Sequence, residues 1–193
     1  RMWDLERKRP VRELLGHTGR INALDADWDA GLALSGSSDS TLRLWDLKLG
    51  VSIEEFKGHT GAVLCIDFDA ALSVAISGSV DCTMRVWSLE SGEMIQEIHG
   101  HQTAVSCIVA DFAGHFALTG GFATLRMWDL RGYAWHSDLS GHTAEVSCIA
   151  VHWPTRRALS GSGDSTLRLW GPSVGGRDKV PIFYNAARPL TCH

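Results

Sequence analysis

Long apolar runs are absent from this sequence of 193 residues, and so is any excess of positive charge. A membrane-spanning helix needs about 18 or more consecutive apolar residues, and no segment approaches that length. No charged-then-apolar segment of the kind that directs secretion stands at the start. Lys and Arg together number 18 against 22 Asp and Glu, for a net charge of −4. Nucleic-acid binding needs a basic footprint, so we expect neither a nucleic-acid nor a membrane partner.

Paired cysteines are also lacking. Cys65, Cys107 and Cys148 each lie six residues after a Gly-His histidine, and the first unit has Ala23 at that position. A small, half-apolar residue at an equivalent position in each unit is typical of core packing. The spacing fits neither a zinc site nor a disulfide framework. We therefore expect reduced thiols, an intracellular location in the cytoplasm or nucleus, and no metal or other cofactor.

Helical periodicity is missing throughout, and a repeat of about 42 residues takes its place. Gly-His recurs at intervals of 42, 42 and 41 residues, and five of the eight tryptophans follow the same spacing. The positions are Gly16–His17, Gly58–His59, Gly100–His101 and Gly141–His142, and then Trp3, Trp45, Trp87, Trp128 and Trp170. Each unit between these markers is therefore expected to be one structural module.

Every unit reads as a series of short strands. An alternating segment such as AVLCIDFD follows Gly-His, and a second run such as SVAISGS comes next. A polar turn leads to a third strand such as TMRVW, and a fourth such as EMIQEI completes the unit. Period-two alternation with β-branched residues is typical of half-buried strands, so we predict an all-β fold with essentially no helix.

Four strands per repeat, with Gly-His early and Trp-Asp late, resemble the blades of the WD-repeat β-propeller family. The resemblance covers residues 1–171, with repeats at about 16–57, 58–99, 100–140 and 141–171. Residues 2–4 and 11–15 resemble the third and fourth strands of an earlier blade, and residues 172–193 form a tail with one strand candidate at 180–184. Ser88 and Gly171 depart from the Trp-Asp pattern at a position that varies in the family.

The number of blades leaves two arrangements open. Four recognisable units can form an arc of a larger ring of about seven blades, or the first strand can close onto the last blade. We favour the arc, because four-bladed WD rings are rare in the family. An arc leaves sheet edges unpaired, so a fragment of this kind is expected to self-associate.

Three units repeat the residue types of a hydrolase triad. A catalytic site is normally built once, whereas this set keeps its spacing in three copies, which indicates structure rather than catalysis. The resemblance implies a buried hydrogen-bonded tetrad running from Asp through His and Ser to the Trp indole. The sets are His17, Ser35, Asp39 and Trp45; His59, Ser77, Asp81 and Trp87; and His142, Ser160, Asp164 and Trp170.

The third unit breaks this rule. It keeps His101, Thr119 and Trp128, but its turn is one residue shorter, and Phe122 or Ala123 stands where Asp is expected. An unmatched buried polar group costs about 1–3 kcal/mol. We therefore predict that the third unit is the least stable.

The resemblance implies a non-catalytic scaffold that presents the loops on one rim to proteins or peptides. The rim candidates are Arg20, Ala62, Ala104 and Glu145 before the first strands, and Ser38, Val80, Phe122 and Gly163 in the turns. Phe122 either fills the gap left by the lost Asp or stands out as a binding anchor. Trp128, Asp129 and Arg131 resemble the motif of cullin-type ubiquitin-ligase receptors, which gives an alternative function as a substrate receptor.

Overall fold

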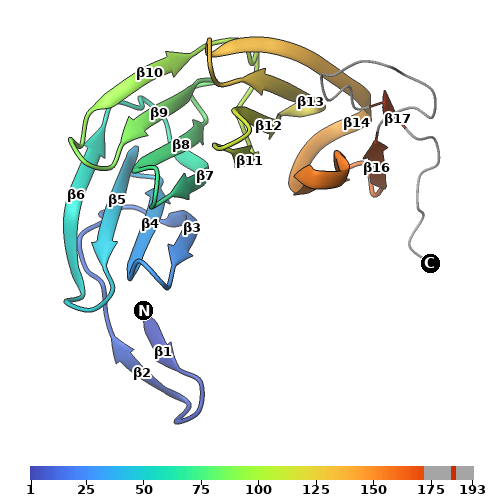
Figure 1. The fold of residues 1–193 in the computed structure, drawn as a ribbon. Helices are drawn as coiled ribbons and strands as arrows, with labels where there is room; N and C mark the ends of the chain where they lie inside the picture. The colour runs from blue at the N-terminus through green and yellow to red at the C-terminus, as the bar shows by residue number, and fades with distance from the viewer. Residues whose placement is uncertain (172–183, 186–193) are drawn as a thin grey trace.

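The structure, a computed structural model, describes residues 1–171 and the backbone of residues 184–185. Strands dominate it, and all of them join into sheets that follow one another along a curved arc (Figure 1). The arc contains one two-stranded hairpin, two four-stranded sheets and one seven-stranded sheet, all antiparallel. The all-β prediction is therefore confirmed.

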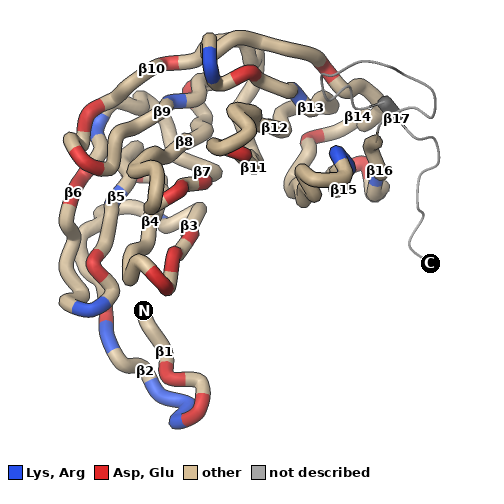
Figure 2. The backbone as a smooth tube through the Cα atoms, in the orientation of Figure 1, with Lys and Arg blue, Asp and Glu red and all other residues tan. Residues whose placement is uncertain are grey.

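The first hairpin, called the half-blade below, consists of β1 (Met2–Asp4) and β2 (Arg9–Arg12). Its second strand begins two residues before the start of the predicted segment 11–15 and ends three residues before the end of that segment. The Asp4 side chain accepts the backbone N–H groups of Glu6 and Arg7 at 3.0 and 2.9 Å, which closes the turn early. Acidic and basic residues both lie at this turn, and charges of both signs also occur along the rest of the arc (Figure 2).

Blades 1 and 2 each have the predicted four strands in chain order. Blade 1 contains β3 (Ile21–Asp27), β4 (Leu32–Ser37), β5 (Thr41–Asp46) and β6 (Val51–Lys57). Blade 2 contains β7 (Val63–Asp69), β8 (Val74–Ser79), β9 (Met84–Ser88) and β10 (Met94–Ile98). Each strand pairs with the next one, so the first strands β3 and β7 lie on the inner side of the arc (Figure 1).

Blades 3 and 4 share one strand. Blade 3 contains β11 (Cys107–Asp111), β12 (Phe116–Gly120) and β13 (Phe122–Asp129), and β14 (Ala134–His152) forms its outer strand. The same β14 then becomes the inner strand of blade 4, followed by β15 (Arg157–Ser162), β16 (Leu167–Gly171) and β17 (Tyr184–Asn185). The two predicted strands pair as expected, residues 134–140 with β13 and residues 146–152 with β15, but they run on as one strand without the expected break near residue 141.

Two further local differences have simple causes. A single 3-10 turn, Trp153–Thr155, interrupts the otherwise helix-free described residues, because Pro154 fixes a helical φ angle there. The strand candidate at residues 180–184 falls mostly outside the described residues, and the observed strand is Tyr184–Asn185, which pairs with β16.

The hydrophobic core lies between blades rather than within them. One buried cluster joins Leu34, Leu42 and Phe56 of blade 1 to Trp87 of blade 2. A second cluster joins blade 2 to Trp128 of blade 3, and a third joins blade 3 to Trp170 of blade 4. Each blade is therefore stabilised by its neighbours.

Glycines in the second strands allow this close packing. A Cβ atom at Gly36 would lie 2.6 Å from Val63 Cγ1 of the next blade, and one at Gly78 would lie 2.6 Å from Val105 Cγ1. Cys65 and Cys107 pack nearby and are buried as predicted, whereas Cys148 is exposed, which corrects the expectation that it fills a core. No blade covers the Cys148 side of blade 4 among the described residues.

We predict that Gly78→Ala destabilises the protein by about 1–3 kcal/mol, because the added methyl group overpacks the contact with Val105. Gly132→Ala is the matched control, since a Cβ atom there has no neighbour within 4 Å. Urea unfolding of both variants measures the difference. Equal stability of the two variants would contradict close packing between blades 2 and 3.

Candidate functional site

Each complete tetrad begins at a buried tryptophan. Trp45 Nε1–H donates to Ser35 Oγ at 2.8 Å, and Trp87 and Trp170 donate to Ser77 and Ser160 at the same distance. An indole has one N–H and needs one acceptor when it is buried. The Ser-Gly pair in the second strand meets this need, because the hydroxyl faces the ring while Gly admits the next blade.

Histidine and aspartate extend this series of hydrogen bonds outward to the turn. His17 Nε2 lies 2.8 Å from Ser35 Oγ, and His17 Nδ1 lies 2.8 Å from Asp39 Oδ2. The same two distances recur for His59 with Ser77 and Asp81, and for His142 with Ser160 and Asp164. The structure therefore brings all three sets of four residues together.

Threonines that the sequence reasoning missed hold the aspartates. The hydroxyls of Thr41, Thr83 and Thr166 donate to the Oδ1 atoms of Asp39, Asp81 and Asp164 at 2.6–2.7 Å. The repeated Asp-x-Thr spacing was the available signal. Burial opposes ionisation of Asp39 and Asp81, but hydrogen bonds from the threonines, the histidines and backbone N–H groups hold their pKa well below the usual value.

Blade 3 keeps only the inner half of this hydrogen-bonded tetrad. Trp128 Nε1–H donates to Thr119 Oγ1 at 2.8 Å, and His101 Nε2 lies 2.7 Å from the same oxygen. No carboxylate contacts His101 in the described part of the chain. Burial and the nearby Arg126 lower the pKa of His101 to about 4. His101 is therefore neutral at physiological pH.

The shorter turn of blade 3 changes what faces solvent. Ala123 has a φ of 62°, close to the 68° of Ser40, so Phe122 takes the position that Asp39 holds in blade 1. Its backbone N–H donates to Thr103 Oγ1 at 3.1 Å, and the residue pairs with Glu145 of β14. Phe122 is 60% exposed, so of the two alternatives it does not fill the gap left by the lost Asp.

The predicted rim residues meet in pairs, and we call this set the turn rim. Ser38 N–H donates to the Arg20 carbonyl at 2.8 Å. Val80 donates to Ala62, and Gly163 donates to Glu145, both at 2.9 Å. Ala104 lies beside the Phe122 turn, since its carbonyl comes close to Gly121. The turn rim therefore comprises Arg20, Ser38, Ala62, Val80, Ala104, Phe122, Glu145 and Gly163.

The residues of the ligase-like motif lie around the turn after β13. Trp128 is buried, and the Asp129 carboxylate accepts the Arg131 backbone N–H at 2.9 Å. Asp46 accepts the Lys48 N–H at 2.7 Å in the same way. Asp129 thus closes a turn in blade 3 as Asp46 does in blade 1, while the Arg131 side chain is exposed.

Repeated four-stranded blades with buried tryptophans define an arc of a β-propeller. The family model described as "WD domain, G-beta repeat" matches residues 8–46, 50–88, 92–129 and 135–171, and the chain belongs to this WD40 family. Each match begins near the outer strand of one blade and ends at the third strand of the next. No curated protein matches the chain. Proteins with these repeats generally act as interaction scaffolds rather than as catalysts.

The described residues hold no group of three or more His, Cys, Asp or Glu placed to bind a metal ion. Within the same part of the chain, no helix has the length and apolar character to cross a membrane.

We predict that restoring the longer turn stabilises blade 3. Replacing residues 121–123 with Ser-Gly-Asp-Ser, the turn of blade 4, supplies a carboxylate for His101, and such a bond contributes about 1.5–3 kcal/mol. Urea unfolding measures the gain, and amide exchange compares residues 101–139 with residues 59–98. Ser-Gly-Asn-Ser is the control of equal length. A gain of equal size with this control would show that loop length, not the carboxylate, limits the stability of blade 3.

We predict that the stability of the His101→Gln variant differs most from that of the parent protein near neutral pH. The folded-state pKa of His101 is about 4, below its usual 6.5, so the parent loses stability as the pH falls from 6.5 toward 4. Gln does not titrate, and the stability gap between the two proteins therefore narrows over this range.

The difference in stability between the two proteins cancels the contributions of the other groups that titrate, because both proteins contain them. Burial raises the pKa of Asp67 to about 6, which adds stability as the pH falls and opposes the effect of His101. Unfolding of both proteins at pH 7 and pH 4.5 tests the prediction. A gap that stays constant would contradict it.

Proposed function

We propose that the protein is a non-catalytic scaffold that binds a partner polypeptide at the turn rim, with Phe122 as the anchor. The observation that carries this proposal is the exposure of two apolar side chains on the turns of successive blades. Phe122 is 60% exposed and Val80 is 48% exposed. Single exposed apolar residues are ordinary, but an aromatic side chain on a fixed turn is typical of binding hot spots.

The backbone around Phe122 is well held. Thr103 Oγ1 accepts its N–H, and Val146 N–H donates to the Gly121 carbonyl at 3.0 Å. A ring presented on a rigid turn loses little conformational entropy when it binds. Glu145 pairs with Phe122 across β14 and is exposed, which favours a partner with an apolar side chain next to a basic one.

The serines argue against a hydrolase. Ser35, Ser77 and Ser160 are each at most 1% exposed, and each hydroxyl already accepts an indole N–H. A nucleophile needs a substrate pocket and an oxyanion hole beside it. The tetrads therefore support a structural role, in which Asp, His and Ser satisfy a buried tryptophan.

The function as a substrate receptor of a cullin-type ubiquitin ligase remains a separate hypothesis. It depends on the exposed Arg131, because Trp128 and Asp129 have structural roles of their own. Co-purification of the ligase adaptor, lost with Arg131→Ala, would support it. Absence of binding by the parent protein would exclude it.

We predict that Phe122→Ala lowers partner binding by about tenfold or more, since a central aromatic contact contributes about 2 kcal/mol or more. Proximity labelling in cells, followed by affinity measurement with the partners found, compares the variant with the parent. Leu49→Ala is the matched control, because Leu49 is also exposed but lies in the turn between β5 and β6 at the opposite end of the strands. Equal loss in both variants, or none in Phe122→Ala, would contradict the proposed anchor.

A further inference from the structure

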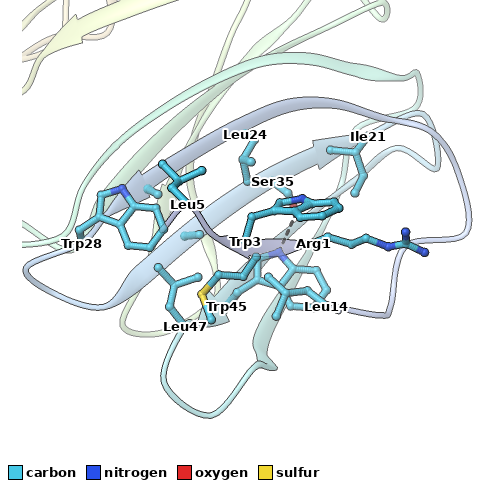
Figure 3. Close-up of a pocket in the computed structure, with 13 residues that line it drawn as sticks. Arg1, Trp3, Leu5, Leu14, Ile21, Leu24, Trp28, Ser35, Trp45 and Leu47 are labelled. Carbon is cyan, nitrogen blue, oxygen red and sulfur yellow. Dashed lines mark hydrogen bonds between the residues drawn. The ribbon is translucent and has the colours of Figure 1, made fainter. Parts of the chain in front are cut away.

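An apolar groove opens between blades 2 and 3 at the end of the strands opposite the turn rim. Its volume is about 190 Å³. The side chains that line it include Leu72, Val74, Phe112, Leu130 and Tyr133. A larger cavity of about 360 Å³ lies beside the half-blade, around Trp3 and Trp45, where the structure describes only two strands on one side (Figure 3). Both walls of the groove, in contrast, are blades with four described strands.

Two aromatic side chains distinguish this groove from the boundary between blades 1 and 2. Phe112 begins the loop after β11, at the position that Ala70 holds after β7. Tyr133 lies in the turn after β13, at the position that Gly92 holds in the turn after β9. The groove therefore presents two rings where the neighbouring boundary has only Ala and Gly.

The backbone of Tyr133 has a conformation that favours glycine. Its φ angle is 51°, in the left-handed region, and Gly50 and Gly92 at the same position of blades 1 and 2 have φ angles of 72° and 73°. A bulky residue in this region is uncommon and costs free energy, and such residues cluster at ligand contacts. The Tyr133 side chain is therefore a candidate for contact with a ligand.

The form of the groove limits what can occupy it. Pockets that enclose a drug-sized ligand have volumes of about 300–1,000 Å³, so this groove admits only a few small groups. A helix needs a longer trough for its anchors at every third or fourth residue. β8 and β9 of blade 2 pair on both sides within their sheet and offer no free edge to an added strand. An extended segment that binds through its side chains is therefore favoured.

The chemistry of the lining narrows the choice further. Aromatic side chains in a groove are the surface that proline-rich segments bind. Such segments adopt the polyproline II conformation before binding, and their carbonyl groups remain free to accept hydrogen bonds. The Tyr133 hydroxyl adds a hydrogen-bond donor to the apolar lining.

One positive charge lies next to the groove. Arg131 stands between Leu130 and Tyr133 in the chain and is exposed. None of the ion pairs within the described part of the chain involves Arg131. An acidic residue of a partner would complement this charge.

We propose that the groove binds a proline-rich segment of a partner polypeptide, with proline rings against Phe112 and Tyr133 and an acidic residue beside Arg131. The segment keeps its polyproline II conformation, so it loses little conformational entropy on binding. The site lies at the opposite end of the strands from Phe122 and is independent of the proposed anchor. It also differs from the ligase-receptor hypothesis, which requires Arg131 but neither ring.

The test uses the full chain and a fluorescent peptide of six prolines followed by two glutamates. Fluorescence anisotropy is expected to show saturable binding of one peptide per chain. A peptide with alanine in place of every proline is expected to bind at least tenfold more weakly, because alanine has no ring and does not fix the φ angle.

Two variants of the protein test the apolar contact. Tyr133→Gly is expected to fold, because glycine holds this position in blades 1 and 2, and to bind the proline peptide at least tenfold more weakly. Leu72→Glu is expected to weaken binding to a similar extent, and it is expected to fold because Leu72 is 56% exposed. Leu49→Glu is the matched control, since Leu49 is an exposed leucine at the same end of blade 1. The urea midpoint of each variant verifies that it folds.

A third variant tests the charged contact. Arg131→Ala is expected to lower the affinity for the glutamate peptide several-fold and to leave unchanged the affinity for a peptide that ends in two glutamines. Equal affinity of this variant and the parent for the glutamate peptide would contradict the charged contact. Phe122→Ala is expected to keep full binding of the proline peptide, so this proposal and the proposed anchor fail separately.

Four outcomes overturn the proposal. They are no saturable binding of the proline peptide, equal binding of the alanine peptide, unchanged binding by Tyr133→Gly, and a dimer of the full chain that Leu72→Glu converts to a monomer in sedimentation analysis. The last result would assign the groove to contact between copies of the chain.

Discussion

The structure depends on burying one tryptophan side chain between each pair of blades. The ring removes a large apolar area from water, but its N–H then needs an acceptor that the neighbouring apolar side chains do not provide. Ser35, Ser77 and Ser160 supply that acceptor from the strand beside each ring. A buried hydroxyl needs a partner in turn, which explains the histidine and, beyond it, the aspartate. The interval of 41 or 42 residues follows, because the side chains of the tetrad, of which blade 3 keeps three, must meet at the same depth in each blade.

Because the core lies between blades, no blade is complete by itself. Stability in such repeat structures is approximately a sum of contributions from each unit and its contacts with the next. Inside the arc each blade contacts a neighbouring blade, and the valines at the blade boundaries are fully buried. In the part of the chain that the structure describes, the two end faces lack a complete neighbouring blade, and Ile21 and Cys148 are exposed there. An equivalent residue can therefore be a core residue in one blade and a surface residue in another.

Much of this architecture could be predicted from the sequence, because the repeat constrains strand number, strand order and the residues that face inward. The exposure of Phe122 could not, since a turn that loses one residue can respond by moving its side chain or its backbone. Here Gly121 moves the backbone close to His101 and leaves the ring outside. The continuity of β14 could not be predicted either, because residues 134–152 contain Gly141–His142, which marks a break between strands in the other units. Local sequence alone does not reveal that Phe122 pairs with Glu145 and extends the ladder.

The departures from the repeat, rather than the repeat itself, determine what the surface offers to a partner. In blades 1, 2 and 4 the turn after the second strand carries an ionised aspartate that is fully engaged by its own blade. In blade 3 the same position carries a phenyl ring, so the loss of one carboxylate both weakens the tetrad and replaces a satisfied polar group with an exposed apolar one. The longer ladder between β13 and β14 offsets part of that loss, because it adds the pairing of Phe122 with Glu145. A blade can therefore lose the outer half of its tetrad and expose an apolar side chain at the turn while its buried tryptophan, which Thr119 still satisfies, stays in place.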